Sequence, residues 1–110
     1  MGEIKWSEKA SSNLQAIFDY ISRDSRLYAA RYVKALIKAT KKLEKMPRCG
    51  RMVPEFENRE LREVIYRNHR IVYRVVGKDE DIEILAVVHG ARDMRAVIHE
   101  ERELLSNVFE

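Results

Sequence analysis

The chain has 110 residues, of which 45% are hydrophobic and 35% are charged, and its formal net charge is +3. This length suits a single domain, residues 1–110, with one hydrophobic core. No apolar run reaches the roughly 18 residues of a membrane span, and the first residues lack the apolar segment of a secretory signal. We therefore expect a cytoplasmic protein without membrane contacts, and its modest charge does not by itself require a nucleic-acid partner.

The first part of the chain predicts a short strand followed by two helices. Residues 3–6 mix apolar and charged side chains, as edge strands do, and Ser7 is suited to cap the helix that follows. Apolar residues then recur at spacings of three and four up to about residue 22. After Ser25 a second helix with one apolar face should end before Pro47. Three tyrosines are expected at the seam or rim of this antiparallel hairpin: Tyr20, Tyr28 and Tyr32.

The second part of the chain predicts a sheet. Residues 47–58 contain both prolines and one glycine without a sustained period, which indicates a long connection. Three alternating segments at 61–66, 70–76 and 82–89 predict strands, and their short connections predict an antiparallel meander. Helical spacing returns after Asp93. The expected fold is α+β in the order strand, helix, helix, three strands, helix, with the helical hairpin packed on one face of a small antiparallel sheet.

The middle strand predicts a row of cations on the sheet face that the helices leave uncovered. Side chains alternate along a strand, so Arg70 and Arg74 share a face. Two helices can cover only one face of such a sheet, and these arginines should therefore face solvent. His89, at the end of the next strand, and Arg92, in the turn after it, are expected to join them. Such a surface suits a macromolecule better than a small metabolite.

The role of these arginines has two interpretations. Between residues 47 and 76 the chain contains arginines but no lysine. The planar guanidinium of arginine binds phosphate or carboxylate through two parallel hydrogen bonds. Alternatively, the arginines pair across strands with Glu60, Glu63 and Glu83. Both remain open from the sequence. Exposed strand cations contribute little to stability, so Arg70→Ala and Arg92→Ala should leave the fold intact.

No metal or cofactor is expected. Cys49 is the only cysteine, and the histidines at positions 69, 89 and 99 lie on separate predicted elements without the spacing of a zinc site. The four glycines are scattered, so no glycine-rich loop that binds phosphates is present. No serine lies in a nucleophile elbow.

Several sequence features together point to a known family. They are Trp6 ahead of the first helix, Gly50-Arg51 in the long connection, HRIVYRV at residues 69–75 and HGARD at residues 89–93. In this combination, which covers nearly the whole chain, the sequence resembles the RelE/ParE toxin superfamily, also called plasmid stabilisation proteins. The resemblance implies the toxin of a bacterial type II toxin-antitoxin module, which inhibits growth. It also implies a cognate antitoxin, bound in a heterotetramer or larger assembly.

The superfamily has two functional branches. ParE-like members inhibit DNA gyrase, whereas RelE-like members are ribosome-dependent endoribonucleases that cut mRNA. By resemblance to the ribonuclease branch, Arg70 and Arg92 correspond to arginines that hold a phosphate. Arg62 aligns, with one gap, to a strand that carries lysines in the ribonuclease branch. The ribonuclease branch carries a tyrosine six residues after its last-strand arginine, where this chain has Ile98.

This departure decides between the branches. Cutting RNA without a metal needs a base, an acid and cations, and arginine supplies only the cations. Isoleucine cannot transfer protons. The candidates for the missing role are His89, His99, Glu60, Tyr66 and Tyr73. The resemblance therefore favours a ParE-like gyrase inhibitor that is not an enzyme.

The residues expected to bind the target are Arg62, Arg70, Arg74, His89 and Arg92. If the chain is instead a metal-independent endoribonuclease acting with the ribosome, the catalytic residues are expected to be Arg70, Arg92 and His89. Under either function the antitoxin should present an amphipathic, acidic segment that covers the helix grooves and the arginine face.

Overall fold

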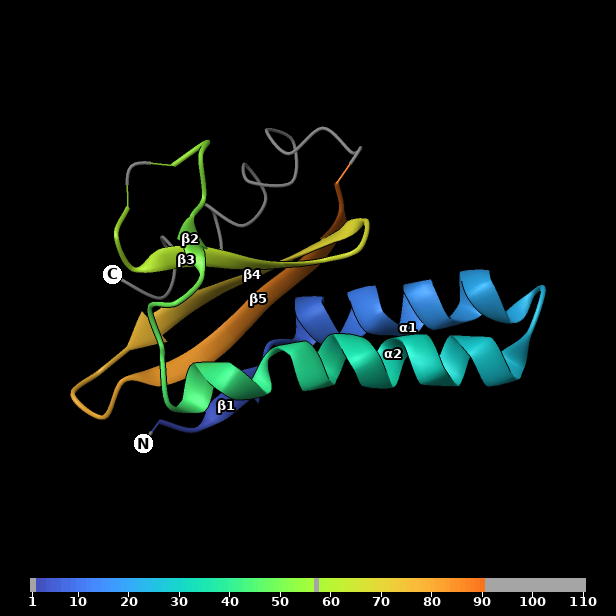
Figure 1. Cartoon of the computed structure of the whole chain (residues 1–110), viewed down its shortest axis with the longest axis horizontal. Helices are drawn as coiled ribbons and strands as arrows, with labels where there is room; N and C mark the ends of the chain where they lie inside the picture. Colours follow the sequence, from blue (N-terminus) through green and yellow to red (C-terminus); the bar gives the residue numbers. More distant parts are fainter. Residues whose placement is uncertain (1, 57, 91–110) are drawn as a thin grey trace.

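The computed structural model describes residues 2–56 and 58–90, which form a helical hairpin packed on a five-stranded sheet (Figure 1). The elements in chain order are β1 (Ile4–Trp6), α1 (Glu8–Ser22), α2 (Arg26–Ala39), the 3-10 helix η1 (Lys41–Glu44), β2 (Arg51–Met52), β3 (Leu61–Tyr66), β4 (His69–Val76) and β5 (Asp81–His89). Among these residues, no helix has the length and apolar character needed to cross a membrane.

Serine caps fix the start of both helices. The Ser7 hydroxyl accepts a hydrogen bond from the amide of Ala10 at 3.0 Å, and the Ser25 hydroxyl accepts one from Tyr28 at 3.1 Å. The helices lie side by side (Figure 1), and α1 packs mainly on β5 while α2 approaches β3. The predicted hairpin is confirmed. Its second helix ends earlier than expected, at Ala39, and the chain continues as η1.

The strands are arranged in the order β1-β5-β4-β3-β2. The three predicted strands are confirmed, with ends that differ by one residue at most. Two features were not predicted. β1 pairs in parallel with β5, so the sheet is mixed, and β2 lies within the expected connection 47–58 and pairs with β3. The helix predicted after Asp93 lies outside the described residues.

The two faces of the sheet are both covered, to different extents. The helices pack on the face of Ile71, Tyr73 and Val75 and form the main core. On the opposite face, Val53 packs with Leu61, Val72 and Leu85, and Phe56 adds to this smaller cluster. The segment between β2 and β3 therefore folds back over the face that was predicted to be exposed to solvent.

A β-bulge in β5 changes which face its last residues occupy. Val72 pairs with Ala86 while Tyr73 pairs with Ile84, so Leu85 is an extra residue in β5. The side chains after it are shifted by one position, and His89 pairs with His69 rather than continuing on the face of Arg70. The prediction that His89 shares the sheet face of Arg70 and Arg74 is therefore wrong in strand register, but His89 and Arg70 still line one hollow at the end of the strands.

Candidate functional site

Two arginines and two glutamates form a network on the face opposite the helices. Its members are Arg51 of β2, Glu55 of the following segment, Glu63 of β3 and Arg70 of β4, and we call it the Glu63 network. Arg70 donates from Nε to Glu63 at 2.7 Å and from its two Nη atoms to Glu55 at 2.9 and 3.0 Å. Arg51 donates from Nε to the other oxygen of Glu63 at 2.5 Å. The cross-strand pairing of Arg51 with Glu63 brings β2 into the site.

Burial distinguishes the members of the Glu63 network. The side chain of Glu63 is 0% exposed and that of Arg70 is 11% exposed, while that of Glu55 is 27% exposed. Hydrogen bonds from Arg70 lower the pKa of the Glu55 carboxyl, and the same bonds raise the pKa of Arg70. The prediction that Arg70 is displayed to solvent is therefore wrong, because two carboxylates and the segment after β2 enclose it.

The other predicted arginines do not extend this site. Arg74 is only 5% exposed and donates to Glu83 at 3.2 Å, so its expected exposure is also wrong. Arg62 pairs with Tyr73 across the strands and therefore lies on the opposite face from Arg70. The pairing interpretation is confirmed for Arg70 with Glu63 and for Arg74 with Glu83.

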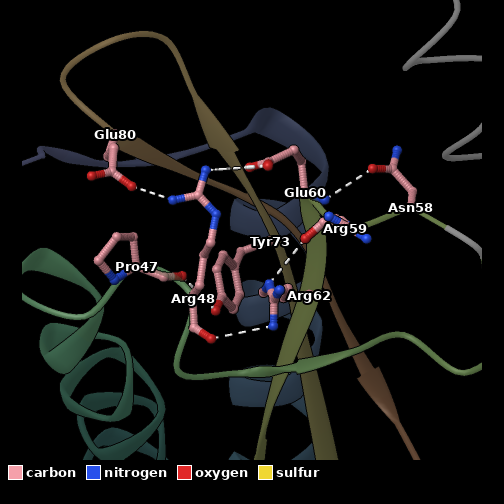
Figure 2. Close-up of polar contacts among 8 residues, drawn as sticks. All are labelled: Pro47, Arg48, Asn58, Arg59, Glu60, Arg62, Tyr73 and Glu80. Atoms are coloured by element: carbon pink, nitrogen blue, oxygen red, sulfur yellow. Dashed lines mark hydrogen bonds and ion pairs between the residues drawn. The ribbon is translucent and has the colours of Figure 1, made fainter.

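Arg62 instead belongs to a clamp that fastens the start of the segment after η1. Its Nε donates to the carbonyl of Arg59 at 2.9 Å, and its Nη1 donates to the carbonyl of Arg48 at 3.2 Å (Figure 2). Nη1 also donates to the carbonyl of Gly50 at 3.0 Å. Because these acceptors are all backbone carbonyls, Arg62 holds the chain in place here. It is not brought together with Arg70.

Arg48 and Tyr73 complete the clamp (Figure 2). Arg48 bridges Glu60, at 2.9 Å, and Glu80 in the β4–β5 turn, which confirms the expected pairing of Glu60 with an arginine. The Tyr73 hydroxyl donates to the carbonyl of Pro47 at 2.8 Å and accepts from the amide of Gly50 at 3.1 Å. Burial raises the pKa of Tyr73. Its hydroxyl is therefore an anchor for the segment rather than a group that could exchange protons with a substrate.

A hollow of about 590 Å³, which we call the large hollow, lies between the helical hairpin and the β3–β4 turn. Tyr20 and Tyr28 are exposed at its rim, and Tyr32 is buried against Tyr66 and His69. This confirms the expected positions of the three tyrosines. The hollow is lined by Asn13, Ala16, Ile17, Tyr20, Ile21, Tyr28, Tyr32, Arg67, Asn68, His69, Val87 and His89. This set contains cationic and apolar side chains but no carboxylate, which suits an apolar or acidic occupant.

Two histidines meet inside this hollow. The rings of His69 and His89 are 5.5 Å apart between centroids, and Nδ1 of His69 lies 2.6 Å from the Tyr32 hydroxyl. Burial lowers the pKa of His69, and a positive charge on His89 lowers it further. His69 is therefore neutral at neutral pH. The two histidines were not predicted to be neighbours, because the sequence gives no sign of the bulge at Leu85.

We expect the pKa of His69 to make stability depend on pH. Because its folded-state pKa is lowered, the unfolded chain binds the proton more readily, and stability falls as the pH drops below about 6.5. The loss is complete once the pH is below the folded-state pKa. The free energy of unfolding of the wild type should fall more steeply than that of His69→Gln in urea titrations between about pH 7.5 and 5. Parallel pH profiles for the two proteins would contradict this expectation.

Arg92, Ile98 and His99 lie outside the described residues, so their predicted roles stay predictions. Two members of the Glu63 network, Arg51 and Glu55, were not singled out as a site from the sequence. Arg51 was noted only as part of a family motif and an arginine-rich stretch. The two-residue strand that brings it to Glu63 is too short to produce a period. Glu55 had no signal beyond its place between the second proline and Phe56.

The family model and three solved structures that match this chain all describe toxins or toxin-antitoxin complexes. The family model described as the ParE toxin of the type II toxin-antitoxin system, parDE, matches residues 4–94. The chromosomal ParDE toxin-antitoxin system from P. aeruginosa is 27% identical, with a TM-score of 0.67 over 81% of this chain and 96% of that chain. No curated protein sequence matches the chain.

Two more distant structures share the fold. The RelBE2 toxin-antitoxin complex from Mycobacterium tuberculosis is 19% identical, with a TM-score of 0.59 over 80% of this chain and 96% of that chain. The isolated E. coli RelE toxin is 13% identical, with a TM-score of 0.52 over 93% of this chain and 98% of that chain.

Proposed function

Because its residues 4–94 match the ParE toxin model, the chain belongs to the ParE toxin family of type II toxin-antitoxin systems, and we propose that it inhibits DNA gyrase. We further propose that a cognate antitoxin neutralises it, in a heterotetramer or larger assembly in the cytoplasm. The similarity to a ParDE system, at 27% identity over 81% of the chain, is the observation that carries the proposal.

The contacts of the described residues favour a protein-binding toxin over an mRNA endoribonuclease. A nuclease needs a cation free to hold the scissile phosphate and a group beside it to move protons. Arg70, which is bonded to Glu55 and Glu63, can supply only the cation, so the choice depends on the proton-transfer group. Of the proton-transfer candidates, Glu60 is paired with Arg48 and Tyr73 is buried. His89 contacts the ring of His69 and also lines a hollow together with Arg70. These contacts support binding as the role of the arginine face.

The large hollow supports an amphipathic, acidic antitoxin segment as its occupant. Its exposed tyrosines offer apolar area with polar ends, and Arg67 supplies a positive charge at the β3–β4 turn. Among the described residues that line it there is no carboxylate to repel an acidic partner. Apolar burial would then provide affinity, and the charges would provide the correct orientation.

Gyrase assays test the proposed activity. We expect the purified chain to inhibit supercoiling by gyrase, and the small acidic protein encoded beside it to restore supercoiling. Arg92→Ala should weaken inhibition about tenfold, which corresponds to the loss of one charge-assisted contact. Lys78→Ala, which removes the same charge from the exposed β4–β5 turn, is the control and should inhibit like the wild type.

Full supercoiling at a large molar excess of the chain would contradict the proposal. Growth arrest accompanied by mRNA cleavage on translating ribosomes would instead identify a RelE-like activity. Absence of growth arrest when the chain is expressed without antitoxin would contradict both functions.

A further inference from the structure

Arg70 is held by two acceptors of different character. Glu63 belongs to a central strand, its side chain is 0% exposed, and it binds Nε of Arg70 at 2.7 Å. Glu55 lies in the segment between β2 and β3, its side chain is 27% exposed, and it binds both Nη atoms of Arg70. The first carboxylate is a fixed part of the sheet. The second approaches the guanidinium from the surface.

Glu63 cannot replace Glu55 if Glu55 moves away. One of its oxygens accepts from Arg70 and the other accepts from Arg51 at 2.5 Å, so each oxygen already has a charged donor. The Glu63 network contains two arginines and two glutamates and is balanced. Without the Glu55 carboxylate it carries one net positive charge, and the two Nη atoms of a side chain that is 11% exposed lose their acceptors. A guanidinium enclosed in this way strongly favours a new anionic acceptor.

The surface beside Arg70 can receive such an acceptor. A hollow of about 370 Å³ adjoins it, and the described residues that line it include Arg51, Arg67, Asn68 and His89 and no carboxylate. Ile65 also lines this hollow; it lies directly across the strands from Arg70 and is 53% exposed. A carboxylate entering here would therefore meet cations, and an apolar neighbour of that carboxylate could pack on Ile65.

We propose that the Nη edge of Arg70 is a binding site for an aspartate or glutamate side chain of a protein partner. Glu55 occupies this site in the isolated chain and is displaced by the incoming carboxylate. The site takes a carboxylate rather than a nucleic-acid phosphate because Glu55 already forms the matching pair of parallel bonds, at 2.9 and 3.0 Å. The imidazole of His89 also lines the hollow and could stack on a base, so the titrations include an oligonucleotide as well as a peptide.

This inference deepens the proposal that Arg70 contacts the target. Its test needs neither gyrase nor antitoxin, so the two proposals can fail separately. An internal competitor lowers the apparent affinity for an external ligand by the fraction of molecules in which the site is open. Removal of the competitor should therefore raise the affinity without any new contact.

Calorimetric titration with a peptide of eight glutamates, at low salt, tests the displacement. We expect Glu55→Gln to bind the peptide about tenfold more tightly than the wild type does. Glu60→Gln is the matched control, because it removes the same charge from the partner of Arg48 and leaves Glu80 in place. Its affinity should stay within about twofold of the wild type. Arg70→Lys in the Glu55→Gln background should abolish the gain, since lysine cannot form the two parallel bonds.

Equal affinities of Glu55→Gln and Glu60→Gln would overturn the proposal. A gain for an eight-nucleotide thymidine strand without a gain for the glutamate peptide would show a phosphate site, and it would overturn the proposal too. Thermal unfolding of each variant accompanies the titrations. If Glu55→Gln does not fold, Glu55→Asp replaces it, because its shorter side chain breaks the paired bonds while keeping the charge. A gain for that variant supports the displacement, and affinity equal to the wild type overturns it.

Discussion

Replacing Arg70 by alanine should lower the free energy of unfolding by about 3 kcal/mol, whereas Arg48→Ala should change it little. Both arginines bind two carboxylates, so the comparison isolates burial. Arg70 is 11% exposed and its partner Glu63 is 0% exposed, while Arg48 is 44% exposed and its partners are exposed to a similar extent. Removing Arg70 leaves a buried carboxylate with Arg51 alone. When Arg48 is removed, its exposed partners Glu60 and Glu80 are hydrated by water instead.

Urea denaturation of the two variants measures this difference. A double-mutant cycle of Arg70→Ala with Glu63→Gln isolates the interaction free energy between these two side chains. A coupling of about 1 kcal/mol or more is expected, because both residues belong to one buried network. Equal losses for Arg70→Ala and Arg48→Ala would show that burial does not decide the contribution. Stability measurements must also accompany any toxicity assay on Arg70, because the loss of a binding contact and the loss of folded protein would both lower toxicity.

The expected loss for Arg70→Ala reverses the sequence-based expectation that the fold would stay intact. Alternation correctly placed Arg70 and Arg74 on the face opposite Ile71, because the side-chain period of a strand is fixed by its backbone. The enclosure of Arg70 depends on Glu55, and the apolar cover of the same face depends on Val53 and Phe56, all of which lie in a segment without a period. The sequence therefore predicts the direction of a side chain well, and its surroundings poorly.

The same limit explains the error in the sheet face of His89. The extra residue, Leu85, lies in the apolar run from Ile84 to Val88, where every residue is compatible with either face. A bulge leaves no signal in such a run. The helical hairpin was predictable because serine caps and apolar spacing act within a few residues of the chain. The family could be identified from motifs that span the chain, whereas the Glu63 network depends on the packing between them.

Gly50→Ala should lower the free energy of unfolding by about 2 to 3 kcal/mol. A Cβ at this position would lie 2.6 Å from the backbone carbonyl oxygen of Glu63 and 2.6 Å from the Tyr73 hydroxyl. Neither atom can move easily, since one belongs to β3 and the other ends a fully buried side chain that also binds Pro47. Gly77→Ala is the control. Gly77 has a φ of 76° but nothing within 4 Å of its Cβ position, so its cost of about 1 kcal/mol reports backbone strain alone.

Tyr73→Phe shows how the clamp transmits this clash. The substitution removes one of the three contacts below 3.0 Å, so Gly50→Ala combined with Tyr73→Phe should lose less stability than the sum of the single variants. Strict additivity in urea denaturation would contradict a direct contact at this hydroxyl. The remaining contacts, with the carbonyl oxygen of Glu63 and with the ring carbon Cε1 at position 73, predict that part of the loss persists in the double variant. Arg51 follows Gly50 directly and donates to Glu63, so a displaced Gly50 also disturbs the carboxylate that holds Arg70.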